Sequence, residues 1–588
     1  MMRRIPAPAR ARLPNAAVPV RCLLAAWAAC ACLWAGGAPA QEAWRAPAAD
    51  RVVVVPDVHG AYAELVALLE ATSLVDEDVG WTGGDSVLVS LGDLLDRGAE
   101  SRNVMDLLMR LQREAPAHGG AVHVLLGNHE AMNLMGDLRY VSPAEYAAFA
   151  ADETTELRER AYAEFVRLQP QLPDAESRAT FAERYPPGFF AHRAAFAPDG
   201  VYGAWLLTLP AVLVVGDTAF AHGGLSGSVA EDVNERVQAR LREYLQLRAQ
   251  LAAPAPPELR ADLETSSEAL ARLALGPELG SESALWYRGT AYCNPLLERP
   301  VLDAALERLG AERLVVGHTP TADRRARALH DGRLIMLDTG MLAEYYGGRP
   351  AALLIERDSV RVRYGDAAEP QALEQGRLEA YGLTEDEIRA VLGTGEIEPA
   401  TLPRDADTAA VTVRRGETTV QAIVYGERSA ATELAAHALD RQLGLNLVPP
   451  TVSRAIDGRR TAVQLRYPDA VTEAERVARR LPLGEFCRLE PQWRLLSAFD
   501  ALAGNDGRSA ENLLYLRETS ELKAIEHGRA FGTERRIRLP DGFALPGEVR
   551  AALAAFDDAA AQGALGEWLG ERQIRALLAR RDALLEAD

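Results

Sequence analysis

Short apolar runs, each followed directly by Gly, Pro or Asp, constrain the fold of this chain more than any other feature. Runs this short, with no polar alternation, are typical of strands that are covered on both faces. Helical stretches separate several of them, as at 61–71 and 101–114. The pattern predicts a layered α/β domain from Arg51 to about Tyr364. The runs are Val52–Val55, Val87–Leu91, Val122–Leu126, Val212–Val215, Leu314–Val316 and Leu334–Leu337.

The rest of the chain is too long to belong to the same core. At 588 residues it predicts two to four domains. Two helical, charged insertions, at about 142–197 and 231–275, interrupt the α/β pattern. Residues 366–401 are acidic and are expected to form a mostly helical connector. A second unit, 402–588, begins with a strand pair (409–414 and 418–425) and a helix (430–443), followed by more strands and a helical C-terminus.

The first forty residues resemble an export signal. Five arginines between positions 3 and 21 precede an apolar run from Cys22 to Trp34, and Ala38-Pro39-Ala40 offers small residues for cleavage. The run is too short for a confident membrane span. We expect a cleaved signal peptide at 1–40, domain boundaries at 41–365, 366–401 and 402–588, and export to a bacterial periplasm. An uncleaved anchor or a lipoprotein is the alternative.

The cysteines bear on whether the protein carries a disulfide, and the net charge bears on whether it binds nucleic acid. Three of the five cysteines lie in the signal, which leaves Cys293 and Cys487. Export permits a disulfide between them, but their separation across two predicted domains favours free thiols. The formal net charge of −20 argues against a general nucleic-acid binder, which would carry a basic face.

Polar motifs follow the predicted strands in order. Strand ends in open α/β sheets hold functional sites, and Asp, His and Asn supply donors for transition metals. A carboxylate such as Asp93 can bridge two ions, which together activate water for an in-line displacement. One such motif alone is weak evidence for a metal site. Five of them in this order, which together contain four of the ten histidines of the chain, predict one. The motifs are Asp57-Val58-His59, Gly92-Asp93-Leu94-Leu95-Asp96-Arg97-Gly98, Gly127-Asn128-His129-Glu130, Ala221-His222-Gly223-Gly224 and Val316-Gly317-His318-Thr319.

This order of motifs resembles the calcineurin-like metallophosphoesterases, and more narrowly the phosphoprotein phosphatase family. Within that family the stretch Glu130–Val141 and the segment Leu285-Trp286-Tyr287-Arg288-Gly289 are most similar to the Shewanella-like branch. The resemblance covers about residues 50–365. It implies a layered α-β-β-α fold with helical insertions.

The resemblance also implies roles for the motif residues. Asp57, His59 and Asp93 would hold one divalent ion, and Asp93, Asn128, His222 and His318 a second; manganese, iron and zinc all suit these donors. His129, oriented by Asp96, would protonate the leaving alkoxide, as a carboxylate partner favours imidazolium. Arg97 and Arg288 would grip the phosphoryl oxygens.

Several residues near the motifs keep two interpretations. A salt bridge is the alternative for Arg288. Arg139 and Tyr140 would bind substrate or pack the insertion. Asp338 would support the site or close a turn. His318 is followed by Thr319-Pro320, without the second histidine of many broader metallophosphoesterases, which agrees with the phosphoprotein phosphatase pattern.

Residues 402–588 are similar to phosphatidylinositol-kinase-like folds, over Gly504–Leu514 and Ala524–Phe531, with the Glu433 helix. The expected catalytic Asp and His positions hold Gly507 and Ser509, Asp506 is displaced by one, and Glu526 replaces a metal-binding Asp. Lys523 is the one lysine of the chain and lies beside the wrong segment for holding nucleotide phosphates. The resemblance implies an α+β, degenerate kinase-like domain that binds a nucleotide, a phosphorylated target or a protein; an unrelated α+β domain is the alternative.

Three functions remain open at this point. The first is hydrolysis of phosphate monoesters by two metals, with Ser, Thr or Tyr phosphoproteins as substrate. The second is hydrolysis of nucleotides or dinucleoside polyphosphates. The third is a binding or scaffold role through residues 402–588. Turnover of phosphopeptides against nucleotides separates the first two, and a binding assay on 402–588 tests the third. No nucleic-acid partner and no membrane span in the mature chain are expected.

Overall fold

The computed structural model describes residues 44–169, 173–251, 268–357, 359–399, 407–483 and 486–587. The expected signal peptide, with its three cysteines, lies outside these ranges. In the described ranges, no helix combines the length and the apolar character needed to cross a bilayer.

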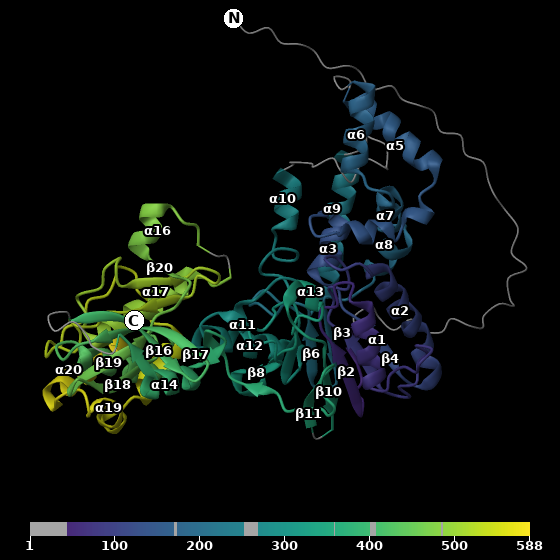
Figure 1. The fold of residues 1–588 in the computed structure, drawn as a ribbon. Helices are drawn as coiled ribbons and strands as arrows, with labels where there is room; N and C mark the ends of the chain where they lie inside the picture. The colour runs from purple at the N-terminus through teal and green to yellow at the C-terminus, as the bar shows by residue number, and fades with distance from the viewer. Residues whose placement is uncertain are drawn as a thin grey trace, which may run out of the picture. The chain divides into compact units, whose positions relative to one another are not determined.

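Two sheets form the first part of the chain (Figure 1). In the five-stranded sheet, β2, β3 and β4 run parallel, and β10 and β11 add antiparallel strands at one edge. The predicted apolar runs supply its three parallel strands. Its order is β11 (Ser359–Tyr364), β10 (Ala351–Glu356), β2 (Arg51–Val55), β3 (Val87–Ser90) and β4 (Ala121–Val124).

The seven-stranded sheet mixes both directions. Strands β6, β7 and β9 are parallel, whereas β5 is antiparallel to β6 and β8 is antiparallel to β9. The strand β6, directly before His222, is not among the predicted runs. The order is β1 (Arg45–Ala46), β5 (Val212–Val215), β6 (Thr218–Ala221), β7 (Arg313–Val316), β9 (Leu334–Met336), β8 (Arg327–Leu329) and β12 (Glu374–Gln375).

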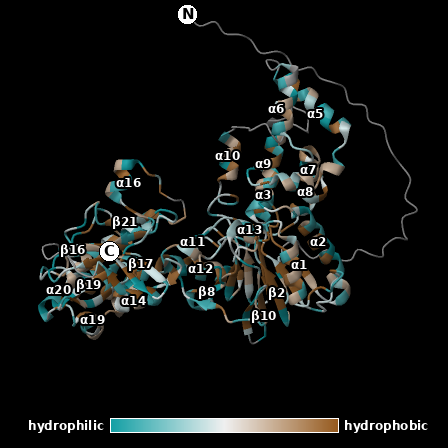
Figure 2. Ribbon diagram, viewed as in Figure 1, coloured by the Kyte–Doolittle hydropathy of each residue, from teal (hydrophilic) through white to brown (hydrophobic). Residues whose placement is uncertain are grey.

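The two sheets share an apolar layer, and helices cover their outer faces. Strand β2 shows the division, because Val52 and Val54 pack toward the second sheet while Val53 and Val55 pack toward helices. Helices α1 (Tyr62–Ala71) and α2 (Ser101–Glu114) cover one sheet, and α12 (Pro295–Leu309) covers the other. Figure 2 shows hydrophobic residues concentrated on the strands. The predicted α-β-β-α layering is confirmed.

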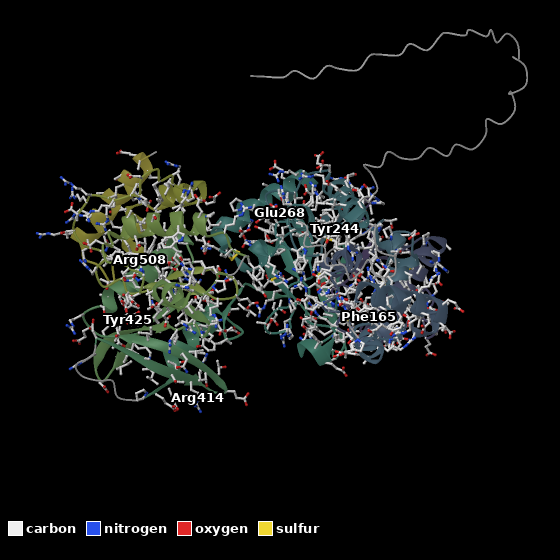
Figure 3. The ribbon with its side chains drawn as sticks, turned by 90° about the horizontal axis from the view of Figure 1, so that it is seen from above. Phe165, Tyr244, Glu268, Arg414, Tyr425 and Arg508 are labelled. Atoms are coloured by element: carbon white, nitrogen blue, oxygen red, sulfur yellow. A yellow bond between two sulfur atoms is a disulfide. The ribbon has the colours of Figure 1, made fainter. Side chains whose placement is uncertain are left out.

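Helical insertions follow β4 and β6, as predicted. The first has an aromatic core of its own, which contains Phe165 (Figure 3), Phe181 and Phe190. Helix α3 (Asn128–Met135), directly after β4, contacts α9 of the second insertion. The remaining helices are α4 (Pro143–Ala147), α5 (Thr155–Leu168), α6 (Asp174–Arg184), α7 (Phe189–Ala195), α8 (Val201–Leu206), α9 (Val233–Leu251), α10 (Glu268–Ala274), α11 (Gly289–Tyr292) and α13 (Ala343–Tyr346).

The prediction of a mostly helical connector at 366–401 is wrong. The described part of this segment contains one helix, α14 (Glu385–Thr394), among the strands β12, β13 (Leu378–Ala380), β14 (Leu383–Thr384) and β15 (Glu396–Glu398). Strand β12 pairs with β8, and β15 pairs with β16 of the next sheet. Glu379 is buried in an ion pair.

The C-terminal part is α+β. A five-stranded antiparallel sheet of β15, β16 (Thr408–Arg415), β17 (Thr418–Tyr425), β19 (Arg459–Leu465) and β18 (Thr451–Ile456) packs on α15 (Ala430–Leu443). The strand pair and the helix match the predicted ranges to within a residue at each end. A small sheet and five further helices complete it: β20 (Ala470–Thr472), β21 (Leu513–Leu516), β22 (Leu522–Ala524), α16 (Glu473–Arg479), α17 (Leu489–Ala503), α18 (Gly547–Ala555), α19 (Asp558–Leu565) and α20 (Glu571–Glu586).

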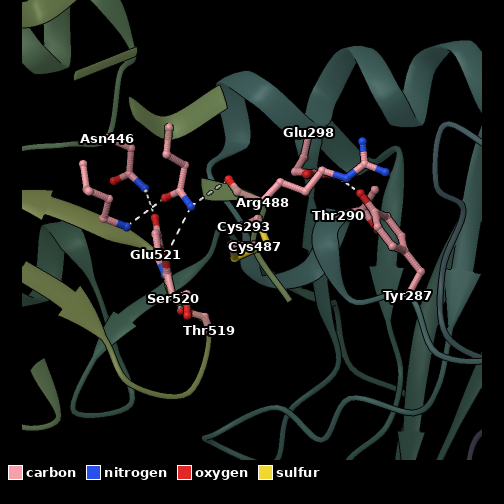
Figure 4. Close-up of a disulfide and its surroundings, with 12 residues drawn as sticks. Tyr287, Thr290, Cys293, Glu298, Asn446, Cys487, Arg488, Thr519, Ser520 and Glu521 are labelled. Atoms are coloured by element: carbon pink, nitrogen blue, oxygen red, sulfur yellow. Dashed lines mark hydrogen bonds between the residues drawn. A yellow bond between two sulfur atoms is a disulfide. The ribbon is translucent and has the colours of Figure 1, made fainter. Parts of the chain in front are cut away.

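Cys293 and Cys487 form a disulfide, which corrects the prediction of free thiols (Figure 4). Their Cα atoms are 5.3 Å apart, within the range that a disulfide spans. The two cysteines are 194 positions apart in the sequence, and no local pattern indicated that they pair. Asn294 donates to the Leu445 carbonyl at 2.7 Å beside it, so polar contacts accompany the covalent link.

The sole lysine of the chain is a buried structural cation. The Lys523 ammonium is fully buried, 2.8 Å from Glu379 and 3.4 Å from Glu521. Glu521 also pairs with Arg377 and accepts from Asn446 (Figure 4). Two carboxylates and two cations thus neutralise one another between β13 and β22, and Lys523 is committed to this network.

Replacing Lys523 by Ala is expected to destabilise the protein by about 3–5 kcal/mol, because two buried carboxylates then share one cation. The urea midpoint, followed by circular dichroism, measures this loss. Arg575→Ala, which breaks an exposed ion pair with Glu571, is the control and is expected to cost less than about 1 kcal/mol. Equal effects of both variants would contradict the structural role of Lys523.

Candidate active site

The six predicted metal ligands come together at the carboxyl ends of the strands. Asp57 and His59 follow β2, Asp93 follows β3, and Asn128 opens α3 after β4. From the other sheet, His222 follows β6 and His318 follows β7. All six side chains are buried, and none is more than 6% exposed. The packing of the two sheets therefore gathers residues that lie up to 261 positions apart in the sequence.

The loops that carry these side chains have unusual backbone conformations. Five non-glycine residues of the site, His59, Asp93, Asp96, Arg97 and His318, have φ between 47° and 70°. Such conformations each cost on the order of 1 kcal/mol, and they cluster at functional sites. A Cβ atom at Gly127 would collide with the Asp93 backbone nitrogen and carboxylate. Glycine at 127 thus permits the close approach of the Asp93 loop.

Hydrogen-bond acceptors face one another around His222. Its Nδ1 donates to the Leu91 carbonyl at 2.9 Å, so its Nε2 carries a lone pair in the neutral ring. That Nε2 lies 2.8 Å from Asn128 Oδ1, 3.1 Å from His318 Nδ1 and 3.2 Å from Asp93 Oδ1. Several lone pairs at these distances repel unless a positive charge lies among them. This donor set therefore fits a transition-metal ion.

A second group of donors surrounds His59. Its Nδ1 donates to the Leu95 carbonyl at 2.9 Å, which directs Nε2 into the site. The Nε2 atom lies 3.8 Å from Asp57 Oδ2 and 3.7 Å from Asp93 Oδ2. Asp93 therefore faces His222 with one oxygen and His59 with the other, as a carboxylate that bridges two ions would.

Buried carboxylates at the site repel one another. Burial is the largest cause that raises the pKa of Asp57, that of Asp338 to about 6 and that of Glu130 to about 7. Neighbouring carboxylates raise the pKa of the His222 imidazole to about 9 despite its burial. The site therefore attracts positive charge, and divalent cations would relieve this repulsion.

His129 and Asp96 form the expected pair. The His129 Nδ1 atom donates to Asp96 Oδ2 at 2.6 Å, and Asn133 donates to the other carboxylate oxygen at 2.9 Å. The imidazole Nε2 lies 3.9 Å from Asp93 Oδ2. Asp96 therefore fixes the ring with Nε2 directed at the metal-ligand cluster.

The two predicted arginines lie at the same site with different partners. Arg97 contacts His59 Nε2 and the Tyr346 hydroxyl, and three tyrosine rings lie 5.2–5.3 Å from its guanidinium. Arg288 stacks at 4.9 Å over Phe486, and in the described ranges it makes no hydrogen bond or ion pair. Its salt-bridge alternative therefore finds no support, and its donors remain available.

Arg139, Tyr140 and Asp338, which each had two interpretations, differ in where they lie relative to the site. Arg139 is exposed and pairs with Asp137. Tyr140 lines the site, with its ring 5.1 Å from that of His129. Asp338 is buried, accepts from the Gly340 backbone N–H at 2.8 Å and keeps Oδ2 without a hydrogen-bond partner in the described ranges.

Sequence reasoning gave no role to two buried glutamates. Glu130 accepts the backbone N–H groups of Gly127, Asp93 and Leu94, each at 2.8 Å, and so ties the two ligand loops together. Its place in Gly127-Asn128-His129-Glu130 was the available signal. Glu145, from the insertion, accepts from the Asp96 N–H at 3.2 Å and from Ser101 at 2.9 Å. No sequence signal connects Glu145 to Asp96.

The predicted kinase-like residues lie in the C-terminal part. Arg508 (Figure 3) pairs with Asp500 at 2.9 Å and donates to the Asn512 and Ile525 carbonyls. Glu433 accepts from the backbone and ring of His527. Asp506 is exposed and pairs with Arg529 at 3.3 Å. These contacts hold two loops together, and kinase-like nucleotide binding stays a prediction.

A pH-dependent stability follows from Glu145. Burial, with Asp96 nearby, raises the pKa of Glu145 from 4.5 to about 8. Between these values the native carboxyl keeps a proton that the unfolded chain has lost, so the free energy of unfolding falls as pH rises. Glu145→Gln is expected to remove up to about 1.4 kcal/mol of this fall per pH unit. Unfolding midpoints at pH 5 and pH 8 measure this fall in stability, and the exposed Glu77→Gln is the control. An unchanged dependence of stability on pH in Glu145→Gln would contradict the prediction.

The chain is similar to known phosphoesterases and phosphatases. A family model for calcineurin-like phosphoesterases matches residues 50–322. The chain is 28% identical to Shewanella-like protein phosphatase 2 of Arabidopsis thaliana, over 53% of this chain and 76% of the relative. It is 23% identical to Shewanella-like protein phosphatase 1 of Plasmodium berghei, over 53% and 73%. A solved cold-active protein-tyrosine phosphatase of a psychrophilic Shewanella species covers 56% of this chain and 82% of its own, with 24% identity and a TM-score of 0.39.

The family match spans the five motifs, and the relatives are phosphatases. The matched range, 50–322, includes all six predicted ligands. The chain therefore carries a calcineurin-like metallophosphoesterase domain and is a metal-dependent phosphatase.

Proposed function

We propose that the protein hydrolyses phosphate monoesters on protein side chains. The observation that carries the proposal is the convergence of the ligand cluster around Asp93 with the His129–Asp96 pair and two arginines. This combination supplies groups for metal binding, leaving-group protonation and phosphoryl binding. The names of the Arabidopsis and Plasmodium relatives support a phosphoprotein substrate.

The metal ligands would divide into two sets that share Asp93. Asp57, His59 and Asp93 would hold one ion, and Asp93, Asn128, His222 and His318 the other. When bound, two divalent ions supply an activated water and offset the charge that develops on the phosphoryl group. Manganese, iron and zinc all accept these donors.

The remaining side chains would act on the substrate directly. His129 would hold a proton on Nε2 and donate it to the departing oxygen, since Asp96 on Nδ1 directs Nε2 into the site. Arg97 and Arg288 would bind the phosphoryl oxygens, for which the guanidinium fork is suited. The tyrosines around Arg97 would contact the group that carries the phosphate.

We also propose that the protein acts outside the cytoplasm. The arginine-rich start and apolar run of residues 1–40 support export. The Cys293–Cys487 disulfide supports it independently, because such bonds persist mainly in oxidising compartments. Mass spectrometry of the protein from a periplasmic extract, with its N-terminus at Gln41 expected, tests this proposal.

Asp93→Asn is expected to lower hydrolysis of p-nitrophenyl phosphate at least about a thousandfold, because the neutral amide cannot bridge two cations. The assay uses protein loaded with manganese, with bound metal measured in parallel. Asp85→Asn, at an exposed position, is the matched control and should leave the rate unchanged. Full activity of Asp93→Asn would refute the proposed hydrolysis mechanism. Faster turnover of nucleotides than of phosphopeptides would refute the proposed substrate class.

His129→Gln is expected to lose about 10²–10⁴-fold in kcat on phosphoserine peptides, whose alkoxide needs a proton to leave. The loss on p-nitrophenyl phosphate should be much smaller, because nitrophenolate leaves unprotonated. Steady-state kinetics on both substrates give the ratio, with exposed His118→Gln as control. An equal loss on both substrates would argue against His129 as the general acid.

A further inference from the structure

A cavity of about 310 Å³ lies where the phosphoesterase domain meets later parts of the chain. Its wall combines residues between 291 and 336 with residues 377–382, 467–469 and 516–519. This volume is at the lower end of the range of roughly 300–1,000 Å³ typical of ligand pockets. The cavity is therefore large enough for one side chain or small group of a substrate.

The cavity adjoins the phosphatase site through two of its wall residues. The Tyr292 backbone N–H donates to the Arg288 carbonyl at 2.9 Å, in the same helical turn. Thr321 lies three residues after the metal-ligand candidate His318, and its N–H donates to the Asp338 carbonyl at 3.0 Å. The wall and the catalytic cluster thus share the loops that follow β7 and precede α12.

The interior of the cavity favours an apolar guest. Its apolar wall includes Tyr292, Ala322, Leu329, Met336, Ala380 and Leu516. Three charged wall residues pair with residues outside the wall: Arg327 with Asp323 at 2.6 Å, Arg377 with Glu521, and Glu379 with Lys523 at 2.8 Å. The other charged wall residues, Asp469, Arg517 and Glu518, are exposed. The buried charges of the wall therefore already have partners, and an apolar side chain that entered the cavity would be removed from water against the apolar residues.

Arg288 connects the cavity with the reacting group. Its guanidinium stacks on Phe486 at 4.9 Å. Burial lowers the pKa of this guanidinium, and nearby Tyr292, Asp93, Asp57 and Glu518 act in the opposite direction. Asp93 and Asp57 belong to the metal cluster, whereas Phe486 and Glu518 lie beyond residue 402. A phosphoryl group held by Arg288 would therefore have residues of the C-terminal part within reach.

The C-terminal wall is fixed in place. The Cys293–Cys487 disulfide lies one residue from Tyr292 and one from Phe486. Arg377 donates to the Cys293 carbonyl at 3.3 Å while it pairs with Glu521. A covalent bond and a buried ion pair thus position the residues that complete the cavity, which lowers the entropic cost of binding there.

We propose that this cavity is a substrate subsite, which binds an apolar side chain next to the phosphorylated residue of a peptide substrate. The C-terminal part then determines which phosphopeptides the phosphatase domain accepts. The inference rests on the proposed phosphatase function and adds the recognition of the substrate's neighbouring residue.

Filling the cavity tests this assignment. Ala322 lines the cavity from an exposed loop position, so Ala322→Trp is compatible with folding. For a phosphopeptide with Leu or Phe beside the phosphorylated residue, on either side, we expect KM to rise about tenfold with kcat within twofold. For p-nitrophenyl phosphate, both constants should stay within twofold. Ala380→Trp, at a second position of the cavity wall, should give the same result, and Ala117→Trp, at an exposed site elsewhere, is the matched control.

A peptide series provides the second comparison. Wild-type full-length protein is expected to have an at least fivefold lower KM for the Leu and Phe peptides than for matched Asp peptides, and Ala322→Trp should abolish that preference. No preference in the wild type, or an equal loss on peptides and p-nitrophenyl phosphate, would overturn the subsite. If the wild type loaded with manganese hydrolyses neither substrate class, the proposed function itself fails, which is a different result from activity without preference.

Discussion

Negative charge buried at the carboxyl ends of the strands is the constraint on which the rest of the structure depends. Asp57, Asp93, Glu130 and Asp338 are all nearly inaccessible to water. Each accepts at least one backbone N–H from another loop or from its own turn. These bonds hold the strained loops in position, but they do not remove the mutual repulsion. Divalent cations would remove it, so the same carboxylates link the stability of the loops to the chemistry of the site.

Three imidazoles of the site complete this arrangement, because each of them has one nitrogen committed to a fixed acceptor. His59 and His222 donate to the backbone carbonyls of Leu95 and Leu91, and His129 donates to Asp96. The second nitrogen of each ring is thereby directed into the site. Two backbone carbonyls and the Asp96 carboxylate thus fix the orientation of these three rings.

The two parts of the chain are joined beside the active site rather than by a simple linker. Strands from 366–401 extend the sheets on both sides, and the disulfide and the Lys523 network lie at the same junction. Local sequence patterns could not predict this. We expected a mostly helical connector at 366–401, whereas Glu379 in this segment pairs with a cation that lies 144 residues later. Two cysteines 194 residues apart gave no sign of their proximity.

The partnership of His129 with Asp96 was implied by the resemblance of the motifs to a known family, whereas the sequence by itself determined the order of the ligand motifs and four of the five strands that precede them. These follow from apolar runs and short motifs, in which the relevant residues lie within a few positions of a strand end. Tertiary structure alone decided the disulfide, the role of Glu145 behind Asp96, and the contact of Phe486 with Arg288. Each of these joins distant segments, and such pairings depend on how sheets and helices pack, which local residue preferences do not encode.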